Sequence, residues 1–306
     1  MRVSYQGQEV NLPDFIIVGA AKCGTTSLYR MLAEHPEIYF PPSEKEPFYF
    51  CFQGREPMEL NDITRKRVIW RTSDYLNLYE PAHEGQRCGD ASTAYLYKHD
   101  ESIAEMERMY GDRLEDVRIT IILRNPVDRA YSHYNFLVRN GYEDLEFAEA
   151  IRPEVIASRK ERRWGFDYLE YGDYADQVAH YVSRFPQVKI FLMSDLDRPQ
   201  QLMDEMTRFL NIRPIEVRES VQANPSGVPK SRFLVDQMRK NKMMKWMVNQ
   251  FPEDTKHRLL NTRDRMMNRL LVKNPMPSDI REMLRQHYSE DIERLESIIG
   301  RSLAHW

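Results

Sequence analysis

The chain is poor in cysteine. It has three in 306 residues, Cys23, Cys51 and Cys88, and their spacing matches neither a zinc site nor a disulfide framework. We therefore expect a protein of a reducing compartment. The sequence also shows no group of ligands at metal-binding spacing, so we expect no metal cofactor.

Long apolar runs are missing as well. No stretch approaches the roughly 18 uninterrupted apolar residues of a membrane-spanning helix, and residues 1–12 are polar, without the apolar centre of a signal peptide. These absences predict a soluble, cytoplasmic protein with no membrane span. A strong charge of one sign is also absent, because 44 Lys and Arg oppose 47 Asp and Glu. This balance disfavours nucleic acid as a partner.

The length of the chain allows one large α/β domain or two small ones. We predict a single domain over residues 1–306, with a core at about 13–232 and a helical, methionine-rich region at about 233–306. Methionines in such a region more often fill a core or an adaptable contact than bind a cofactor.

The first informative stretch covers residues 14–35. Residues 15–18 form a short apolar, β-branched run that predicts a strand buried on both faces, and a glycine follows at once. Apolar residues then recur at helical spacing, with Thr25 or Thr26 as the helix cap. The segment is therefore predicted to be a strand, a tight loop and a helix.

The loop of this segment has the chemistry of an anion site. Backbone N–H groups and a helix N-terminus converge on one spot, and Gly19 and Gly24 let a ligand approach the main chain closely. Lys22 adds one positive charge. Three hydroxyls add further donors, those of Thr25, Thr26 and Ser27.

This loop differs from the P-loop of nucleotide hydrolases. The spacing of Gly19 and Gly24 matches, but Lys22 lies two residues before the second glycine. Thr25 stands where the P-loop lysine belongs. A kinase-like nucleotide enzyme of the same fold would need a lysine there and an acidic metal ligand. A glycine turn with a solvated lysine is the structural alternative.

The second informative stretch is an apolar, β-branched run at 117–123, which predicts another strand. Arg124 ends this strand, and Asn125 and Pro126 have the residue types of a helix cap and a first helical residue. Ser132 lies about two helical turns further, on a face that can look back toward Arg124. Ligands of open α/β sheets bind at the carboxyl ends of strands, so these two side chains are candidates for a phosphate site. A surface ion pair at Arg124 is the structural alternative.

Together the two motifs resemble the sulfotransferases that use 3′-phosphoadenosine-5′-phosphosulfate (PAPS). In that family a loop of Lys, a small residue, Gly, Thr and Thr holds the 5′-phosphosulfate, and an arginine with a serine eight positions on holds the 3′-phosphate. The resemblance covers about residues 13–232. It implies PAPS as donor, 3′-phosphoadenosine-5′-phosphate (PAP) as product, and no metal. It assigns the 5′ end of the donor to Lys22, Cys23, Gly24, Thr25, Thr26 and Ser27, and the 3′-phosphate to Arg124 and Ser132.

The resemblance also reaches Glu46, which precedes an aromatic pair. In heparan-type sulfotransferases a glutamate at this place takes the proton from the acceptor hydroxyl, so Glu46 is implied as the base. Burial against Phe48 and Tyr49 would raise its pKa, as a general base requires. A solvated turn is the structural alternative. His133 is a second candidate, because some relatives use histidine, although a histidine beside a ligand serine is more often an ordinary helix residue.

A loop that closes over the nucleotide is implied at Lys230, Ser231 and Arg232. Golgi relatives carry Lys, Gly, Arg there with flanking cysteines, whereas here Ser231 replaces the glycine and no cysteine follows Cys88. The structural alternative is a linker to the C-terminal region.

Acceptor contacts are predicted at Asp90, Tyr95 and Trp164. Asp90 and Tyr95 belong to a segment that resembles one near the acceptor in the family, and Trp164 beside arginines could stack on a sugar ring. A capping role for Asp90 and a loop anchor at Trp164 are the alternatives. The acceptor stays open among glycans, lipids and small metabolites.

The sequence thus predicts an α/β, P-loop-like three-layer fold, with a central parallel sheet flanked by helices and a helical C-terminal extension. The predicted activity moves the sulfonate of PAPS to a hydroxyl, or with less support an amine, of a carbohydrate or small metabolite. Lys22 would stabilise the leaving phosphate in an in-line displacement, and Glu46 would act as base. A P-loop kinase-like enzyme and a PAPS- or PAP-binding protein without catalysis are the alternatives. Oligomeric state is left undetermined.

Overall fold

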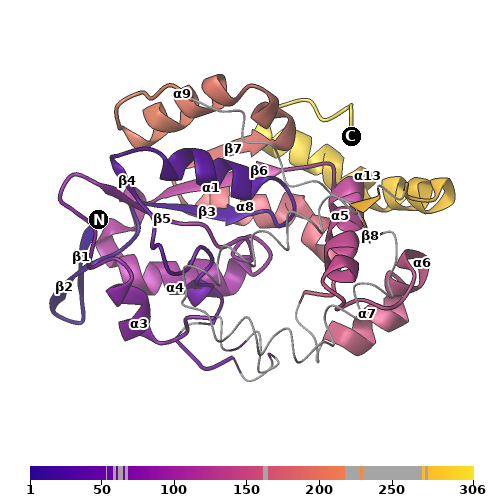
Figure 1. The fold of residues 1–306 in the computed structure, drawn as a ribbon, viewed down its shortest axis with the longest axis horizontal. Coiled ribbons are helices and arrows are strands. Elements are labelled where there is room, and N and C mark those ends of the chain that lie inside the picture. The colour runs from indigo at the N-terminus through magenta and orange to yellow at the C-terminus, as the bar shows by residue number, and fades with distance from the viewer. Residues whose placement is uncertain are drawn as a thin grey trace.

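The centre of the computed structural model is a five-stranded sheet (Figure 1). The structure describes residues 1–52, 54–57, 60, 65, 68–160, 165–217, 228–229, 271–272 and 275–306. Four predicted site residues lie outside these described residues, Trp164, Lys230, Ser231 and Arg232.

The strands of the central sheet follow the order β4-β5-β3-β6-β7, and every neighbouring pair is parallel. Their bounds are β3 (Phe15–Gly19), β4 (Ile38–Tyr39), β5 (Arg87–Asp90), β6 (Arg118–Leu123) and β7 (Val188–Leu192). All five residues of β3 are buried, as its continuous apolar run predicts for a strand covered on both faces. The carboxyl end of β3 therefore lies at the middle of the sheet edge, between β5 and β6.

Helices cover both faces of the sheet. Figure 1 shows α1 and α9 on one side and α4 on the other, and α8 packs beside α4. The larger helices are α1 (Thr25–Ala33), α4 (His99–Tyr110), α5 (Pro126–Arg139), α8 (Tyr174–Arg184), α9 (Pro199–Leu210) and α13 (Ser278–Ile299). The predicted three-layer α/β fold is confirmed.

Shorter elements connect these layers. They are the helices α3 (Thr72–Asn77), α6 (Phe147–Ala150) and α7 (Pro153–Lys160), and the 3-10 turns η1 (Tyr49–Cys51), η2 (Gly111–Asp116), η3 (Glu170–Gly172) and η4 (Met193–Asp197). Two antiparallel pairs stand outside the main sheet, β1 (Arg2–Tyr5) with β2 (Gln8–Asn11) and β8 (Val228–Pro229) with β9 (Leu271–Val272).

The two helices that follow the motif strands begin differently. Helix α5 begins as predicted: Pro126 is its first residue, and the Asn125 side chain accepts a hydrogen bond from the Val127 N–H at 2.9 Å. Helix α1 has Gly24 as its N-cap, at φ 96°, and no side chain caps it. The predicted threonine cap is therefore wrong. Thr25 is already helical, and glycine adopts the left-handed conformation that the turn requires.

The C-terminal helix α13 is part of the core packing. It lies against α5 and α8, and its Leu284 and Tyr288 are fully buried in an apolar cluster with residues of α5. The expected helical C-terminal segment is thus present over Ser278–Ile299. It packs onto these two helices instead of standing apart as an appendage.

Candidate active site

The loop between β3 and α1 places both of its glycines where a side chain would collide. A Cβ on Gly19 would lie 2.6 Å from the Leu96 Cβ, and one on Gly24 would lie 2.4 Å from the Leu196 Cδ1. The glycines therefore serve the packing of the loop against two neighbouring segments, in addition to the ligand approach that the sequence predicts. Helix α1 starts here with no acidic residue in its first turn, so its first N–H groups form a positive end for an anion.

Lys22 carries the positive charge of this loop. Its Nζ lies 4.2 Å from the centre of the Phe136 ring on α5. The pKa of Lys22 is lowered to about 8, first by burial and then by the positive charges of Arg139 and Arg124. Among the described residues Lys22 forms no ion pair with a carboxylate. A partly desolvated cation beside other cations is stabilised by an anionic ligand.

Arg124 follows β6 and lies against the same loop. Its Nη1 donates to the Lys22 carbonyl oxygen at 3.5 Å, so the two motifs meet although they are far apart in the sequence. Ser132, on α5, is 9% exposed. A guanidinium and an ammonium group at neighbouring strand ends fit a ligand that carries more than one anionic group.

The remaining loop side chains differ in accessibility. Thr26 is partly exposed, whereas Thr25 and Ser27 are buried. Cys23 is fully buried, its Sγ lies 3.4 Å from the Tyr174 hydroxyl oxygen, and burial raises the pKa of its thiol. Cys23 therefore supports the loop from the core, and its side chain is not placed to bind a nucleotide.

Glu46 sits opposite the start of α1. Its Oε1 accepts a hydrogen bond from Lys45 Nζ at 2.8 Å, and its Oε2 accepts one from the Thr93 hydroxyl at 3.4 Å. The side chain is 26% exposed, so an acceptor can approach it. The sequence predicted an apolar setting for this carboxylate, whereas it accepts hydrogen bonds from a lysine and a hydroxyl.

Lys45 and Thr93 are site residues that sequence reasoning did not single out. Lys45 Nζ also donates to the Thr26 hydroxyl oxygen at 3.3 Å, and this bond connects the Glu46 segment to the first turn of α1. The adjacency of Lys45 to Glu46 was visible in the sequence. Its reach to Thr26 was not, because that contact depends on how the segment folds across the sheet edge.

His133 lies inside the protein. Its side chain is packed edge-on against the rings of Tyr168 and Tyr171, and Arg129 Nη1 lies 3.4 Å from its Nδ1. Burial and the charge of Arg129 hold the pKa of His133 well below its ordinary value. This position supports the structural interpretation of His133, not a role as base.

Asp90 and Tyr95 are also interior residues, 1% and 0% exposed. Asp90 accepts hydrogen bonds from the hydroxyls of Tyr75, Tyr95 and Ser92 at 2.9, 2.9 and 2.7 Å. Burial raises the pKa of Asp90 to about 6 although these bonds oppose the rise. Direct contact with an acceptor is therefore not the role that this geometry supports. Ser92 also accepts from the Phe48 N–H at 3.1 Å, so the network positions the segment that carries Glu46.

A cavity of about 410 Å³ lies elsewhere, between α13, the C-terminal tail and the first turn of α5. Val127, Arg285, Glu293 and Trp306 are among its lining residues. None of the predicted site residues that the structure describes lines it. The charged groups that converge at the sheet edge, and not this cavity, define the candidate site.

The fold and the site together define a class. A parallel sheet whose carboxyl edge carries a cationic loop, a helix N-terminus and a neighbouring arginine is an α/β protein built to bind a phosphate-bearing ligand. The chain belongs to the sulfotransferase domain family, whose sequence pattern matches residues 12–296.

Several known proteins are similar to this chain. Carbohydrate sulfotransferase 15 of Homo sapiens is 25% identical over 272 residues, which cover 72% of this chain and 47% of that protein. The human bifunctional heparan sulfate N-deacetylase/N-sulfotransferase 3 is 26% identical over 215 residues, 66% of this chain and 23% of that protein. The chain thus spans about half the length, or less, of these curated relatives.

A solved structure matches over nearly the whole chain. The crystal structure of a sulfotransferase from Alicyclobacillus acidocaldarius is 30% identical, covers 97% of this chain and 99% of its own, and superposes with a TM-score of 0.73. Within the described residues, no helix is long and apolar enough to cross a membrane.

Proposed function

We propose that this protein transfers the sulfonate group of PAPS to a hydroxyl group of an acceptor. Membership of the sulfotransferase domain family supports the reaction class. The observation that carries the proposal is that Arg124 lies against the loop of Lys22: its Nη1 donates to the Lys22 backbone carbonyl oxygen at 3.5 Å, and its charge lowers the pKa of the Lys22 ammonium group. These two side chains can hold opposite phosphates of one doubly phosphorylated adenosine.

The proposed contacts with the two ends of PAPS are based on where each side chain lies at the sheet edge. The first N–H groups of α1 and the Thr26 hydroxyl would bind the 5′-phosphosulfate, and Lys22 would neutralise the charge that grows on the leaving phosphate. Arg124 would bind the 3′-phosphate through its planar guanidinium, together with Ser132. Lys230, Ser231 and Arg232 stay a prediction for the same phosphate.

The transfer step needs one base and one cation. The acceptor oxygen forms its bond to sulfur while the bond between sulfur and the phosphate oxygen breaks, and the negative charge stays on PAP beside Lys22. Glu46 takes the proton of the acceptor hydroxyl. Lys45 holds Glu46 and Thr26 at 2.8 and 3.3 Å, so it keeps the base next to the loop that binds the donor.

The acceptor is proposed to be a carbohydrate or a small metabolite. The names of the relatives, a carbohydrate sulfotransferase and a heparan sulfate N-sulfotransferase, support a sugar hydroxyl first and an amine second. The role of Trp164 as an acceptor contact stays a prediction. The cytoplasmic location of the protein also stays a prediction.

Two measurements test this function. Thermal unfolding should shift upward with PAP and far less with adenosine 5′-phosphosulfate, which lacks the 3′-phosphate that Arg124 would bind. Labelled PAPS should then pass its sulfonate to sugars in an acceptor screen, and Lys22→Ala should abolish the transfer.

The outcomes separate the alternatives. A shift with PAP but no transfer to any acceptor would indicate a binding protein without catalysis. Magnesium-dependent turnover of ATP, without a response to PAP, would favour a kinase-like enzyme and contradict the proposal.

A further inference from the structure

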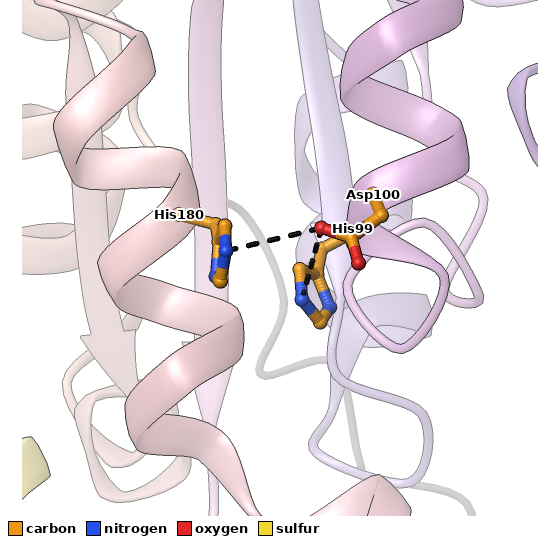
Figure 2. A group of neighbouring side chains, drawn as sticks. All are labelled: His99, Asp100 and His180. Atoms are coloured by element: carbon orange, nitrogen blue, oxygen red, sulfur yellow. Dashed lines mark ion pairs between the residues drawn. The ribbon is translucent and has the colours of Figure 1, made fainter.

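Two histidines and an aspartate from different helices gather on the face of the sheet that α4 and α8 cover. His99 and Asp100 begin α4, and His180 lies on α8 (Figure 2). Figure 2 shows the two imidazole rings facing each other with the Asp100 carboxylate beside them. One ligand atom from each residue lies within 4.8 Å of the others. We expected no metal site because the sequence shows no evident cluster of ligands, and His180 lies far along the chain from His99 and Asp100.

The distances in this group are too long for hydrogen bonds and suit a shared cation. Asp100 Oδ1 lies 3.5 Å from His99 Nε2 and 3.8 Å from His180 Nε2. Direct N–H···O bonds are about 2.7–3.2 Å long. Ligands held at about 2.0–2.2 Å by a tetrahedral zinc ion lie about 3.4 Å apart, close to both observed values. Small rotations of the side chains would complete such a geometry.

The surroundings of the two imidazoles leave their Nε2 atoms available to a metal. His180 Nδ1 lies 2.7 Å from the Asp176 carbonyl oxygen. A carbonyl accepts only from a protonated ring nitrogen, so the proton is on Nδ1 and the Nε2 lone pair is free to coordinate. The Nδ1 atom of the His99 imidazole is buried and has no hydrogen-bond partner among the described residues. Within the part of the chain that the structure describes, Asp100 is the partner given for the Nε2 atoms of both rings.

The Asp100 carboxylate is the negatively charged member of the group, and the nearby lysine and arginines pair with other carboxylates. Three cations lie on the neighbouring turns, and each is paired with a carboxylate: Lys98 with Glu101, Arg184 with Glu107, and Arg294 with Asp176. The structure gives Asp100 no lysine or arginine partner among the described residues, only the two histidines. Asp100 and His180 are 77% and 52% exposed, so an ion can enter from solvent and water can fill the remaining position.

We propose that His99, Asp100 and His180 bind a divalent transition metal of the zinc class. Two imidazole nitrogens and one carboxylate oxygen suit zinc and its neighbours better than magnesium, which prefers oxygen ligands and keeps its waters. The ion would join the start of α4 to α8, two helices that the Arg184–Glu107 pair also joins further along. The inference does not depend on sulfonate transfer.

Calorimetric titration of the untagged, metal-free full chain with ZnCl₂ and with MgCl₂ tests this site. Zinc should bind once per chain and raise the unfolding temperature, and magnesium should do neither. Loss of an outer-shell partner weakens metal binding about 10–100-fold, so loss of a ligand in His180→Ala or Asp100→Asn should weaken it at least about 100-fold. Both residues are exposed, so both variants should fold, which circular dichroism checks.

The matched control is His83→Ala, which removes an exposed histidine that is not a member of the group and should leave zinc affinity unchanged. Cobalt provides an independent readout, since tetrahedral Co²⁺ absorbs visible light strongly and that absorption should vanish in His180→Ala. Zinc binding that survives both ligand substitutions, or that weakens equally in the control, would show adventitious binding and overturn the proposal.

Discussion

At the scale of single residues, the chemistry depends on the setting of Lys22. The same ammonium group that would stabilise the leaving phosphate is partly desolvated and lies over the Phe136 ring. It is also repelled by the positive charges of Arg139 and Arg124. These features lower the pKa of Lys22 to about 8 in the protein without ligand. Binding of an anionic donor would favour the charged form.

The pKa of Lys22 predicts a pH dependence. Lysine is charged below its pKa, so the fraction of free enzyme that can bind the donor falls as pH rises through about 8. The kcat/KM for PAPS, which reports the free enzyme, should therefore fall by about tenfold per pH unit above that value. In Lys22→Arg the charge persists, and the alkaline fall should disappear even if the rate is lower. An identical fall in both proteins would assign the titration to another group.

Substitution of Glu46 separates chemistry from donor binding. Glu46→Gln keeps the shape of the side chain and loses the proton acceptor, so kcat should fall by about 10²–10⁴-fold while the affinity for PAP stays within about twofold. Steady-state rates and calorimetric titration with PAP measure the two effects.

The matched control for this substitution is Glu80→Gln, which changes an exposed glutamate that is not among the candidate site residues and should leave kcat unchanged. Retention of the wild-type rate by Glu46→Gln would require a different base.

At the scale of elements, the turn η4 supports the donor loop. Leu196 of η4 packs against Gly24. Asp195 accepts from the Leu192 N–H at 2.8 Å and from both terminal nitrogens of Arg301 at 2.6 Å. Burial tends to raise the pKa of Asp195, but the hydrogen bonds from Arg301 and Leu192 outweigh it and hold this pKa below its usual value. The C-terminal tail thus fixes a turn that shapes the active-site loop.

Asp195→Asn tests this coupling. The amide oxygen can still accept from Leu192, but the ion pair with Arg301 is lost. Because Arg301 is 41% exposed, solvent screens the pair, and we expect a loss of about 1–2 kcal/mol in the free energy of unfolding. Urea denaturation measures it.

Arg198 provides the comparison for this prediction. It lies 3.8 Å from Asp195 and is 63% exposed, so Arg198→Ala should cost less than about 0.5 kcal/mol. Equal losses in the two variants would mean that the Arg301 pair contributes no specific stability.

At the scale of the whole molecule, α13 packs the C-terminal region of the chain onto α5 and α8. The Tyr288 ring is fully buried against Gly172, and its hydroxyl donates to the Leu169 carbonyl oxygen at 2.9 Å. A Cβ added to Gly172 would lie 2.8 Å from that hydroxyl. Helix α13 therefore carries packing that the central fold needs.

Truncation of Tyr288 should destabilise the entire fold. Tyr288→Ala removes a buried aromatic ring, so we expect a loss of roughly 3–5 kcal/mol, whereas Tyr288→Phe loses only one hydrogen bond and about 1 kcal/mol. Urea denaturation followed by circular dichroism measures both. A loss below about 1 kcal/mol for Tyr288→Ala would show that α13 is not integral to the core.

Much of the architecture could be predicted because it depends on patterns of residues that are close in the sequence. The buried strands at 15–18 and 117–123, the Pro126 helix start and the cationic loop each depend on residues close in sequence. Their periodicity and turn chemistry act over a few residues. The helix cap at Gly24 was missed because Thr25 has the more common capping side chain, while the left-handed turn required glycine.

The amino-acid sequence alone thus determined the α/β class and the two motifs at the strand ends, since each is a run of neighbouring residues with its own conformational preference. Tertiary structure decided which side chains share one space. It brought Lys45 to Thr26, buried Asp90 and Tyr95, and set His99 opposite His180. Those contacts depend on how strands and helices pack, and sequence spacing does not encode that geometry.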